Sequence, residues 1–77
     1  MRRKRLLPDD APNEGAKMLR SRALRTKWAR LEELTGIGRD NLMRYAGGRR
    51  RPDVDERVSL ENTLGIPAES WFQEPRK

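Results

Sequence analysis

Side chains that can bond to the edges of DNA bases gather in one short stretch near the middle of the chain. Arg39, Asp40, Asn41 and Arg44 are spaced so that they share the outer face of a short helix. Arginine can donate two parallel hydrogen bonds to guanine, asparagine can pair with adenine, and aspartate can accept from cytosine. The stretch therefore offers polar side chains to a major groove. The alternatives are a solvated helix face and a simple Asp40–Arg44 pair.

Three consecutive arginines, Arg49, Arg50 and Arg51, follow this helix. Positive side chains beside a base-reading helix can neutralise phosphates, which adds affinity but little sequence information. Lys27, at the start of the preceding helix, is also placed to meet phosphate, together with the backbone amides of that helix end. The alternative for the arginine loop is a charged loop that serves solubility.

Two short helices joined by a glycine turn are expected to position these side chains. Gly36 stands where a helix C-terminus needs a left-handed residue, and Gly38 can act as a modest N-cap of the next helix. The apolar residues expected to share a core are Leu31, Ile37, Leu42 and Tyr45. One helix that buttresses and a second, over about residues 39–47, that presents polar groups is the layout of a helix-turn-helix.

Two helices are predicted before the glycine turn. The first covers about residues 15–25, and its buried side is expected to comprise Met18, Leu19, Ala23 and Leu24. The second covers about residues 27–35, with Thr26 as its N-cap. Spacing by three and four residues predicts its inner side, which comprises Trp28, Leu31 and either Leu34 or Thr35.

Two more helices are predicted after the arginine loop. One begins with Asp53 as its N-cap and ends at about Leu64, before Gly65. Its inner side is expected to comprise Val54, Val58 or Leu60, Glu61 and Leu64. A short fifth helix follows Pro67, from Ala68 to about Phe72. Because no segment alternates with period two, the predicted fold class is all-α, with five short helices around one core.

The predicted organisation is an arm, one domain and a tail. Residues 1–14 are expected to form a flexible basic arm, residues 15–73 the domain, and residues 74–77 a polar tail. The basic block at the start comprises Arg2, Arg3, Lys4 and Arg5. Three roles are open for this block. It could contact a minor groove or phosphates of DNA, it could make no contact with DNA, or it could bind RNA.

Composition limits the functions that the chain can have. Its 77 residues carry a net charge of +6, which favours nucleic acid as the partner, with an anionic membrane second and mere solubility as the plain alternative. It contains no cysteine and no histidine, which removes disulfides, thiol chemistry, nearly all metal sites and the commonest general base. With Ser21, Ser59 and Ser70 isolated, we expect no enzyme, no metal and no cofactor.

The chain resembles the Cro/repressor-type helix-turn-helix domains of phage and bacterial regulators, often called the XRE family. The resemblance covers about residues 16–72 and rests on four blocks in the right order and spacing. They are Thr35-Gly36-Ile37-Gly38-Arg39, Leu42-Met43-Arg44-Tyr45, Gly48-Arg49-Arg50-Arg51-Pro52, and the segment from Leu64-Gly65-Ile66-Pro67 to Trp71-Phe72. It implies a lambda-repressor-like arrangement of the helices.

The chain departs from the family pattern at three places. Glu32 stands where the family usually has alanine or another small residue, so the packing of the two helices is expected to be looser or shifted there. Gly38 stands where the family often has a serine or threonine, which caps the helix predicted over about residues 39–47 and contacts phosphate. Trp28 stands near the position where the family commonly has a glutamine that contacts phosphate. Trp28 cannot make that contact, and Lys27 is the residue that could replace it.

The resemblance implies roles for individual residues. The base contacts would be Arg39, Asp40, Asn41, Met43 and Arg44, and the phosphate contacts would be Lys27, Gly38, Arg49, Arg50 and Arg51. Trp71 and Phe72 either complete the core or form a surface where two copies meet. Family members often bind palindromic operators as two-fold pairs.

The expected function is that of a sequence-specific regulator of transcription. It would act as a dimeric repressor at an operator in double-stranded DNA, in the cytoplasm of a bacterial or phage-infected cell, without a small-molecule ligand or a membrane partner. Its size is that of a Cro-type regulator or of a domain of a longer protein. The alternatives are an antitoxin or adaptor whose main partner is a protein, an RNA-binding protein, and a nonspecific nucleic-acid binder.

Overall fold

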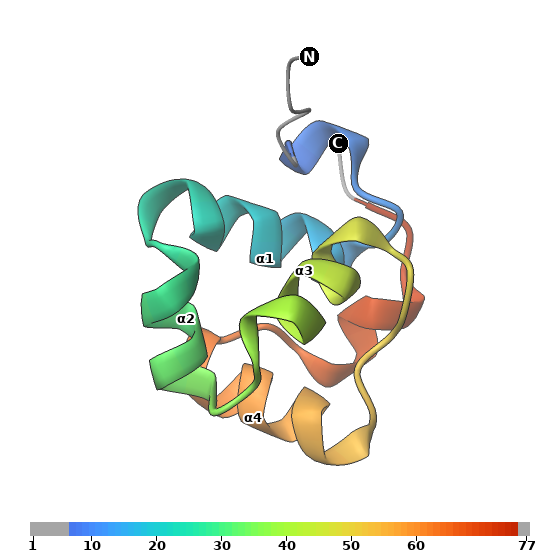
Figure 1. Cartoon of the computed structure of the whole chain (residues 1–77). Coiled ribbons are helices and arrows are strands. Elements are labelled where there is room, and N and C mark those ends of the chain that lie inside the picture. Colours follow the sequence, from blue (N-terminus) through green and yellow to red (C-terminus); the bar gives the residue numbers. More distant parts are fainter. Residues whose placement is uncertain (1–6, 76–77) are drawn as a thin grey trace.

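Helices account for all the regular structure in the part of the chain that the computed structural model describes, residues 7–75. The α-helices are α1 (Glu14–Arg25), α2 (Trp28–Thr35), α3 (Arg39–Gly47) and α4 (Val54–Leu64), as Figure 1 shows. Two 3-10 helices, η1 (Pro8–Asp10) and η2 (Ala68–Phe72), flank them. The all-α class is confirmed, but the segment expected as a fifth α-helix is the 3-10 helix η2. No helix in residues 7–75 is long and apolar enough to cross a bilayer.

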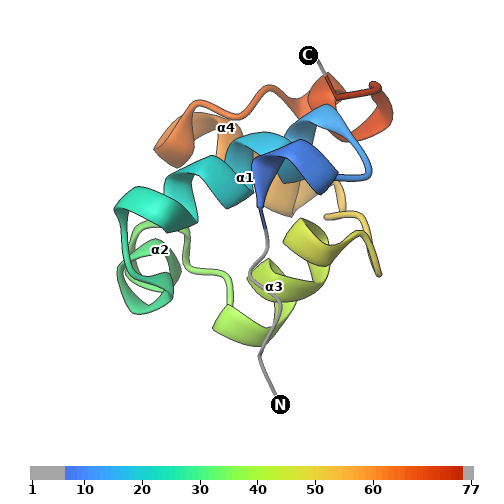
Figure 2. The same ribbon diagram turned by 90° about the horizontal axis from the view of Figure 1, so that it is seen from above.

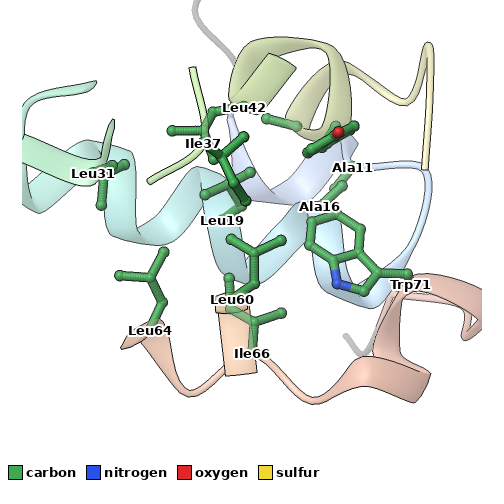
Figure 3. Close-up of a cluster of buried hydrophobic side chains, with 12 residues drawn as sticks. Ala11, Ala16, Leu19, Leu31, Ile37, Leu42, Leu60, Leu64, Ile66 and Trp71 are labelled. Atoms are coloured by element: carbon green, nitrogen blue, oxygen red, sulfur yellow. The ribbon is translucent and has the colours of Figure 1, made fainter. Parts of the chain in front are cut away.

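One apolar cluster joins all four α-helices. In Figure 3, Leu19 of α1 lies between Leu42 of α3 and Leu60 of α4, and all three are fully buried. At the other end of the cluster the rings of Tyr45 and Trp71 meet edge to face, with centroids 6.3 Å apart. Each helix therefore buries one side against the others, and the opposite sides face solvent.

Trp71 packs directly on the backbone of α1. A Cβ atom on Gly15 would overlap the six-membered ring of its indole, so only glycine allows this contact. Trp71 is fully buried, and its indole N–H has no hydrogen-bond partner among the described residues. The core role expected of Trp71 is thus confirmed.

The segment before α1 belongs to the domain, so the prediction of a flexible arm is wrong from residue 7 onward. Ala11 is buried in the core, and the side chain of Asn13 caps α1 by accepting from the backbone N–H of Ala16 at 2.7 Å. The backbone N–H of Glu14 donates to the carbonyl of Gln73 at 2.9 Å, which joins the two ends of the domain (Figure 1). The Asn13 cap is local, but the bond between Glu14 and Gln73 links residues far apart in sequence, and the local pattern of charge and proline does not reveal it.

In α4 and α1 the buried residues differ in part from those predicted. In α4 the buried residues are Leu60 and Leu64, whereas Val54 is 64% and Val58 49% exposed, and Glu61 is exposed too. At 100° per residue the two valines lie on a different side of the helix from the two leucines, so the stripe of two leucines defines the inner side. In α1 the prediction holds for Leu19, which is buried, and for Met18 and Ala23, which pack partly buried against the core, but Leu24 is exposed.

Helix ends follow the sequence in part. Asp53 caps α4 as predicted, in a reciprocal capping box with Glu56. Thr26 is the C-cap of α1 and not the N-cap of α2. The N-cap of α2 is Lys27, whose side chain makes no capping hydrogen bond. On the inner side of α2, Thr35 is buried and Leu34 is exposed.

Helix α1 supplies guanidinium groups to the C-termini of two other helices. The Nε atom of Arg20 donates to the carbonyl of Ala46 at the end of α3, at 2.7 Å, and its Nη1 donates to the carbonyl of Leu7 at 2.8 Å. Arg22 donates to the carbonyl of Leu64 at the end of α4, at 3.0 Å. Burial lowers the pKa of Arg20, and the Asp10 carboxylate acts in the opposite direction. The guanidinium nevertheless stays charged, because arginine is not deprotonated in proteins.

We expect Gly15→Ala to lower the free energy of unfolding by about 1–3 kcal/mol, because the added methyl group must displace the indole of Trp71. Urea unfolding followed by tryptophan fluorescence measures the change. Gly47→Ala is the matched control, since a Cβ there meets no atom within 4 Å. The control should be neutral or stabilising by up to about 1 kcal/mol. Equal effects of the two substitutions would contradict the close contact.

We expect Arg20→Met to lower the free energy of unfolding by about 2–3 kcal/mol, because two carbonyl groups lose a charged donor while the apolar stem is kept. Arg25→Met, an exposed arginine of the same helix, should stay within about 0.5 kcal/mol of the parent. Hydrogen exchange should also quicken at the C-terminal end of α3 in the Arg20 variant alone. Unchanged exchange there would show that Arg20 does not hold this end.

Candidate nucleic-acid interface

A three-residue turn, residues 36–38, connects α2 to α3 and is pinned on both sides. The hydroxyl of Thr35 donates to the carbonyl of Leu31 at 2.8 Å and accepts from the backbone N–H of Ile37 at 3.1 Å. Gly36 is left-handed, with φ of 73°, as the sequence predicts for this helix end. Ser59 of α4 donates to the Thr35 carbonyl at 2.7 Å. The angle between α2 and α3 is thus fixed from within and from α4.

Glu32 holds the start of α3 from the preceding helix. Its Oε2 accepts a hydrogen bond from the backbone N–H of Arg39 at 2.7 Å, while Gly38, the N-cap residue, offers no side chain. The Glu32 side chain is exposed, and its carboxylate reaches across the turn to this amide. The looser or shifted packing expected at Glu32 stays a prediction. The capping role was not predicted, since seven residues separate the two partners.

The outer face of α3 carries most of the expected base-contact residues. Arg39, Asp40, Met43 and Arg44 are exposed, and Asn41 is half-buried. The inner face of the helix is closed, since Leu42, Tyr45 and Ala46 are buried. In Figure 2, α3 lies along one edge of the molecule, with the loop that follows it (yellow) beside it.

A surface hollow runs along this face of α3. It has a volume of about 360 Å³ and is lined by Asp40, Met43, Arg44, Gly47 and Arg49. The structure therefore brings three of the predicted base-contact residues and one predicted phosphate-contact residue to a single depression. Arg39 and Asn41 lie on the same helix outside it.

The arginine loop leaves α3 through a tight C-terminus. Gly48 is left-handed, with φ of 78°, and a Cβ on it would overlap the ring of Pro12, so the loop passes close to the N-terminal segment. The backbone N–H of Arg49 returns to the carbonyl of Arg44 at 3.0 Å, which closes the helix end. Arg49, Arg50 and Arg51 are all exposed, as a phosphate-contacting loop requires.

The far end of the loop is tied to α3 by a buried hydroxyl. Tyr45 donates to Glu56 Oε1 at 2.5 Å, and the same oxygen accepts from the backbone N–H of Asp53 at 3.3 Å. Burial raises the pKa of Tyr45, the hydrogen bond and charge of Glu56 raise it further, and the charge of Arg50 acts in the opposite direction. Tyr45 is therefore a hydrogen-bond donor at every physiological pH, and it couples α3 to the first turn of α4.

Phe72 serves neither as core nor as an isolated surface residue. Its ring is 59% exposed and lies 5.2 Å from the guanidinium carbon of Arg51 and 5.1 Å from that of Arg57. Arg57 is itself held by the carbonyl of Pro52 at 2.8 Å. The ring thus supports one arginine of the loop through cation–π contact. Its expected place on a dimer surface stays a prediction.

The other predicted phosphate contacts are placed less tightly. Lys27 is exposed at the start of α2, and Trp28 packs partly buried against the core, away from any phosphate role. The basic block of Arg2, Arg3, Lys4 and Arg5 lies outside the described residues. No group of three or more metal-ligating side chains gathers within residues 7–75.

Charge is distributed unevenly along α3. At its N-terminal end the carboxylates of Glu32 and Asp40 accompany Arg39, whereas Arg44 and the three loop arginines stand at its C-terminal end.

Comparison with known proteins finds no matching family model, no matching curated protein and no matching solved structure.

We expect Phe72→Leu to lower the free energy of unfolding by about 0.5–1 kcal/mol, the size of an exposed cation–π contact. The ring-current shifts of the Arg51 and Arg57 side-chain protons, measured by NMR, should disappear. Val54→Ala, at an exposed apolar residue of α4, is the control that leaves these shifts in place. A change from dimer to monomer on Phe72→Leu, seen by sedimentation, would instead assign the ring to a dimer surface.

Proposed function

We propose that the chain is a sequence-specific double-stranded DNA-binding protein of the Cro/repressor type, with α2, the glycine turn and α3 as its helix-turn-helix. The observation that carries the proposal is the composition of the α3 surface. Asp40, Met43 and Arg44 line one hollow together with Arg49, the first residue of an exposed arginine loop. Side chains that can bond base edges thus lie beside an arginine that can bond phosphate. The opposite face of α3 is buried in the core, so only this face is open to a ligand.

Rigidity supports this assignment. Base readout needs side chains held in register with the groove, and sites on fixed helices provide this better than sites on loops. Thr35 and Ser59 hold the turn before α3, and Arg20 holds the C-terminal end of α3. An α3 fixed in this way can enter a major groove without a change of backbone, as preformed interfaces commonly do.

The two groups of side chains divide the work. Arg44, in the hollow, is suited to donate two hydrogen bonds to a guanine. The loop arginines neutralise phosphates on either side of the groove and give affinity that depends on salt. We infer a dimeric regulator that occupies an operator with half-sites about one helical turn, roughly 34 Å, apart, and that represses transcription there.

Selection from random-sequence DNA with the purified chain, at two salt concentrations, tests the proposal. An enriched inverted repeat supports a dimeric operator-binding protein and reveals the operator. Binding without an enriched motif, with a steep salt dependence, would make the chain a nonspecific nucleic-acid binder. Absence of binding would overturn DNA as the partner and favour a protein partner, as in an antitoxin or adaptor.

We expect Arg44→Ala to weaken binding to the selected DNA by about 1–3 kcal/mol and to relax the preference at one base pair, because one bidentate contact is lost. Arg50→Ala should weaken binding to all sequences alike and reduce the slope of log K against log salt by about one unit. Fluorescence anisotropy with selected and scrambled duplexes measures both. An unchanged base preference in the Arg44 variant would remove α3 from the base-reading role.

A further inference from the structure

The start of α3 is capped by a side chain that belongs to α2. Gly38 precedes the helix with φ of −58° and ψ of 144°, the extended conformation of an N-cap, but it has no side chain to accept from the first amides. The carboxylate of Glu32 accepts from the first of them, on Arg39, at 2.7 Å. Two departures from the family pattern, glutamate at 32 and glycine at 38, thus have one physical reason: the cap has moved from the turn to the preceding helix.

This bond fixes the start and the direction of α3. A carboxylate at a helix N-terminus is favoured by the helix dipole as well as by the hydrogen bond. Because Glu32 reaches across the turn from α2, the bond also restrains one helix relative to the other. A side-chain cap at residue 38 would accept from the second or third amide of α3 instead, and it would not restrain α2.

The same carboxylate changes what the end of α3 can bind. Free amides at a helix N-terminus are a ready site for phosphate, and the dipole strengthens it. In this chain a negative group already occupies the first amide, and Asp40 adds a second negative charge within the first turn. Arg39 stands beside these two carboxylates, so this end of α3 attracts a DNA phosphate less than the C-terminal end does, where Arg44 and the arginine loop stand.

We propose that Glu32 is a positioning and specificity-determining residue of the DNA-binding surface. It sets the start of α3 and keeps the DNA backbone away from that end, so that binding relies on base contacts in the hollow and on the loop arginines. For DNA without the operator sequence, attraction to phosphates is the main source of affinity, so the negative charge of Glu32 weakens this binding more than it weakens operator binding and thereby raises discrimination between the two. The inference rests on the proposed function in its second part, and its first part, the cap, stands without it.

Three variants separate the cap from the charge. Glu32→Gln keeps an oxygen that can accept from the Arg39 amide but removes the charge. Glu32→Ala removes both, and Gly38→Ser combined with Glu32→Ala restores a local cap without the charge. A serine fits at 38, because the only atom near a Cβ there is Glu32 Oε2, at 4.0 Å. Glu33→Gln is the matched control, since its carboxylate pairs with Arg30 at 3.1 Å rather than with α3 and the net charge changes equally.

Thermal unfolding tests the cap. We expect Glu32→Ala to lower Tm by about 4–8 °C, the shift that loss of one helix cap produces in a domain of this size. Glu32→Gln should have a Tm close to that of the parent. The Gly38→Ser, Glu32→Ala double variant should regain most of the Tm that Glu32→Ala loses. A Tm for Glu32→Ala equal to that of Glu33→Gln would overturn the capping role.

Binding to a scrambled duplex and to the selected duplex tests the charge. We expect Glu32→Gln and the double variant to bind the scrambled duplex about 2–5-fold more tightly than Glu33→Gln does, as removal of a charge at a helix terminus implies. Their preference for the selected duplex should fall accordingly. If the parent binds DNA and Glu32→Gln matches Glu33→Gln, the charge role is wrong and the proposed function stands. If the parent binds no DNA, the proposed function and the charge role both fail, while Tm still decides the cap.

Discussion

The placement of α3 depends above all on the buried guanidinium of Arg20. The carbonyls at the C-terminus of a helix carry partial negative charge and have no partner within the helix, so a buried end needs a donor. Arg20 gives α3 that donor and at the same time binds the segment before α1. At the other end Glu32 supplies an acceptor to the first amide. Each end of α3 is thus met by a charge of the sign that its dipole favours, and both charges come from other helices.

The same solution recurs in α4, which shows that α1 organises the domain by charge as well as by apolar contact. Asp53 meets the N-terminus of α4 and Arg22 the carbonyl of Leu64 at its C-terminus. Between these ends Leu19 and the Gly15–Trp71 contact bring α1 close enough for its arginines to reach. Since the ends and the inner face of α3 are satisfied inside the domain, its outer face is left exposed.

Features that depend on a local sequence pattern could be predicted from the sequence. Helix boundaries near Gly36 and Gly65, the Asp53 cap and the buried Leu31, Leu42 and Tyr45 follow from glycine, capping and spacing, and the structure agrees. Prediction failed where a residue's role is set by a partner distant in sequence. The local pattern does not distinguish Arg20 from the exposed Arg25 of the same helix, and it predicts an arm over residues 7–13 and an inner face at Val54 and Val58. On α3 the prediction of an outer face agrees with the exposure of Arg39, Asp40, Met43 and Arg44, whereas Asn41 is half-buried.

Net charge alone is therefore a poor measure of how many cations this chain can offer to a polyanionic partner. Of the cations that give it +6, Arg20 and Arg22 cap helices, Arg30 pairs with Glu33, and Arg57 binds the Pro52 carbonyl. Arg44 and the arginines of the loop gather at the C-terminal end of α3, where all four are exposed. A protein that bound DNA by charge alone would need no carboxylates beside its cations. On α3 itself Asp40 and the carboxylate of Glu32 lie at one end and Arg44 at the other, and under the proposed function this asymmetry would favour one register of a duplex along the helix.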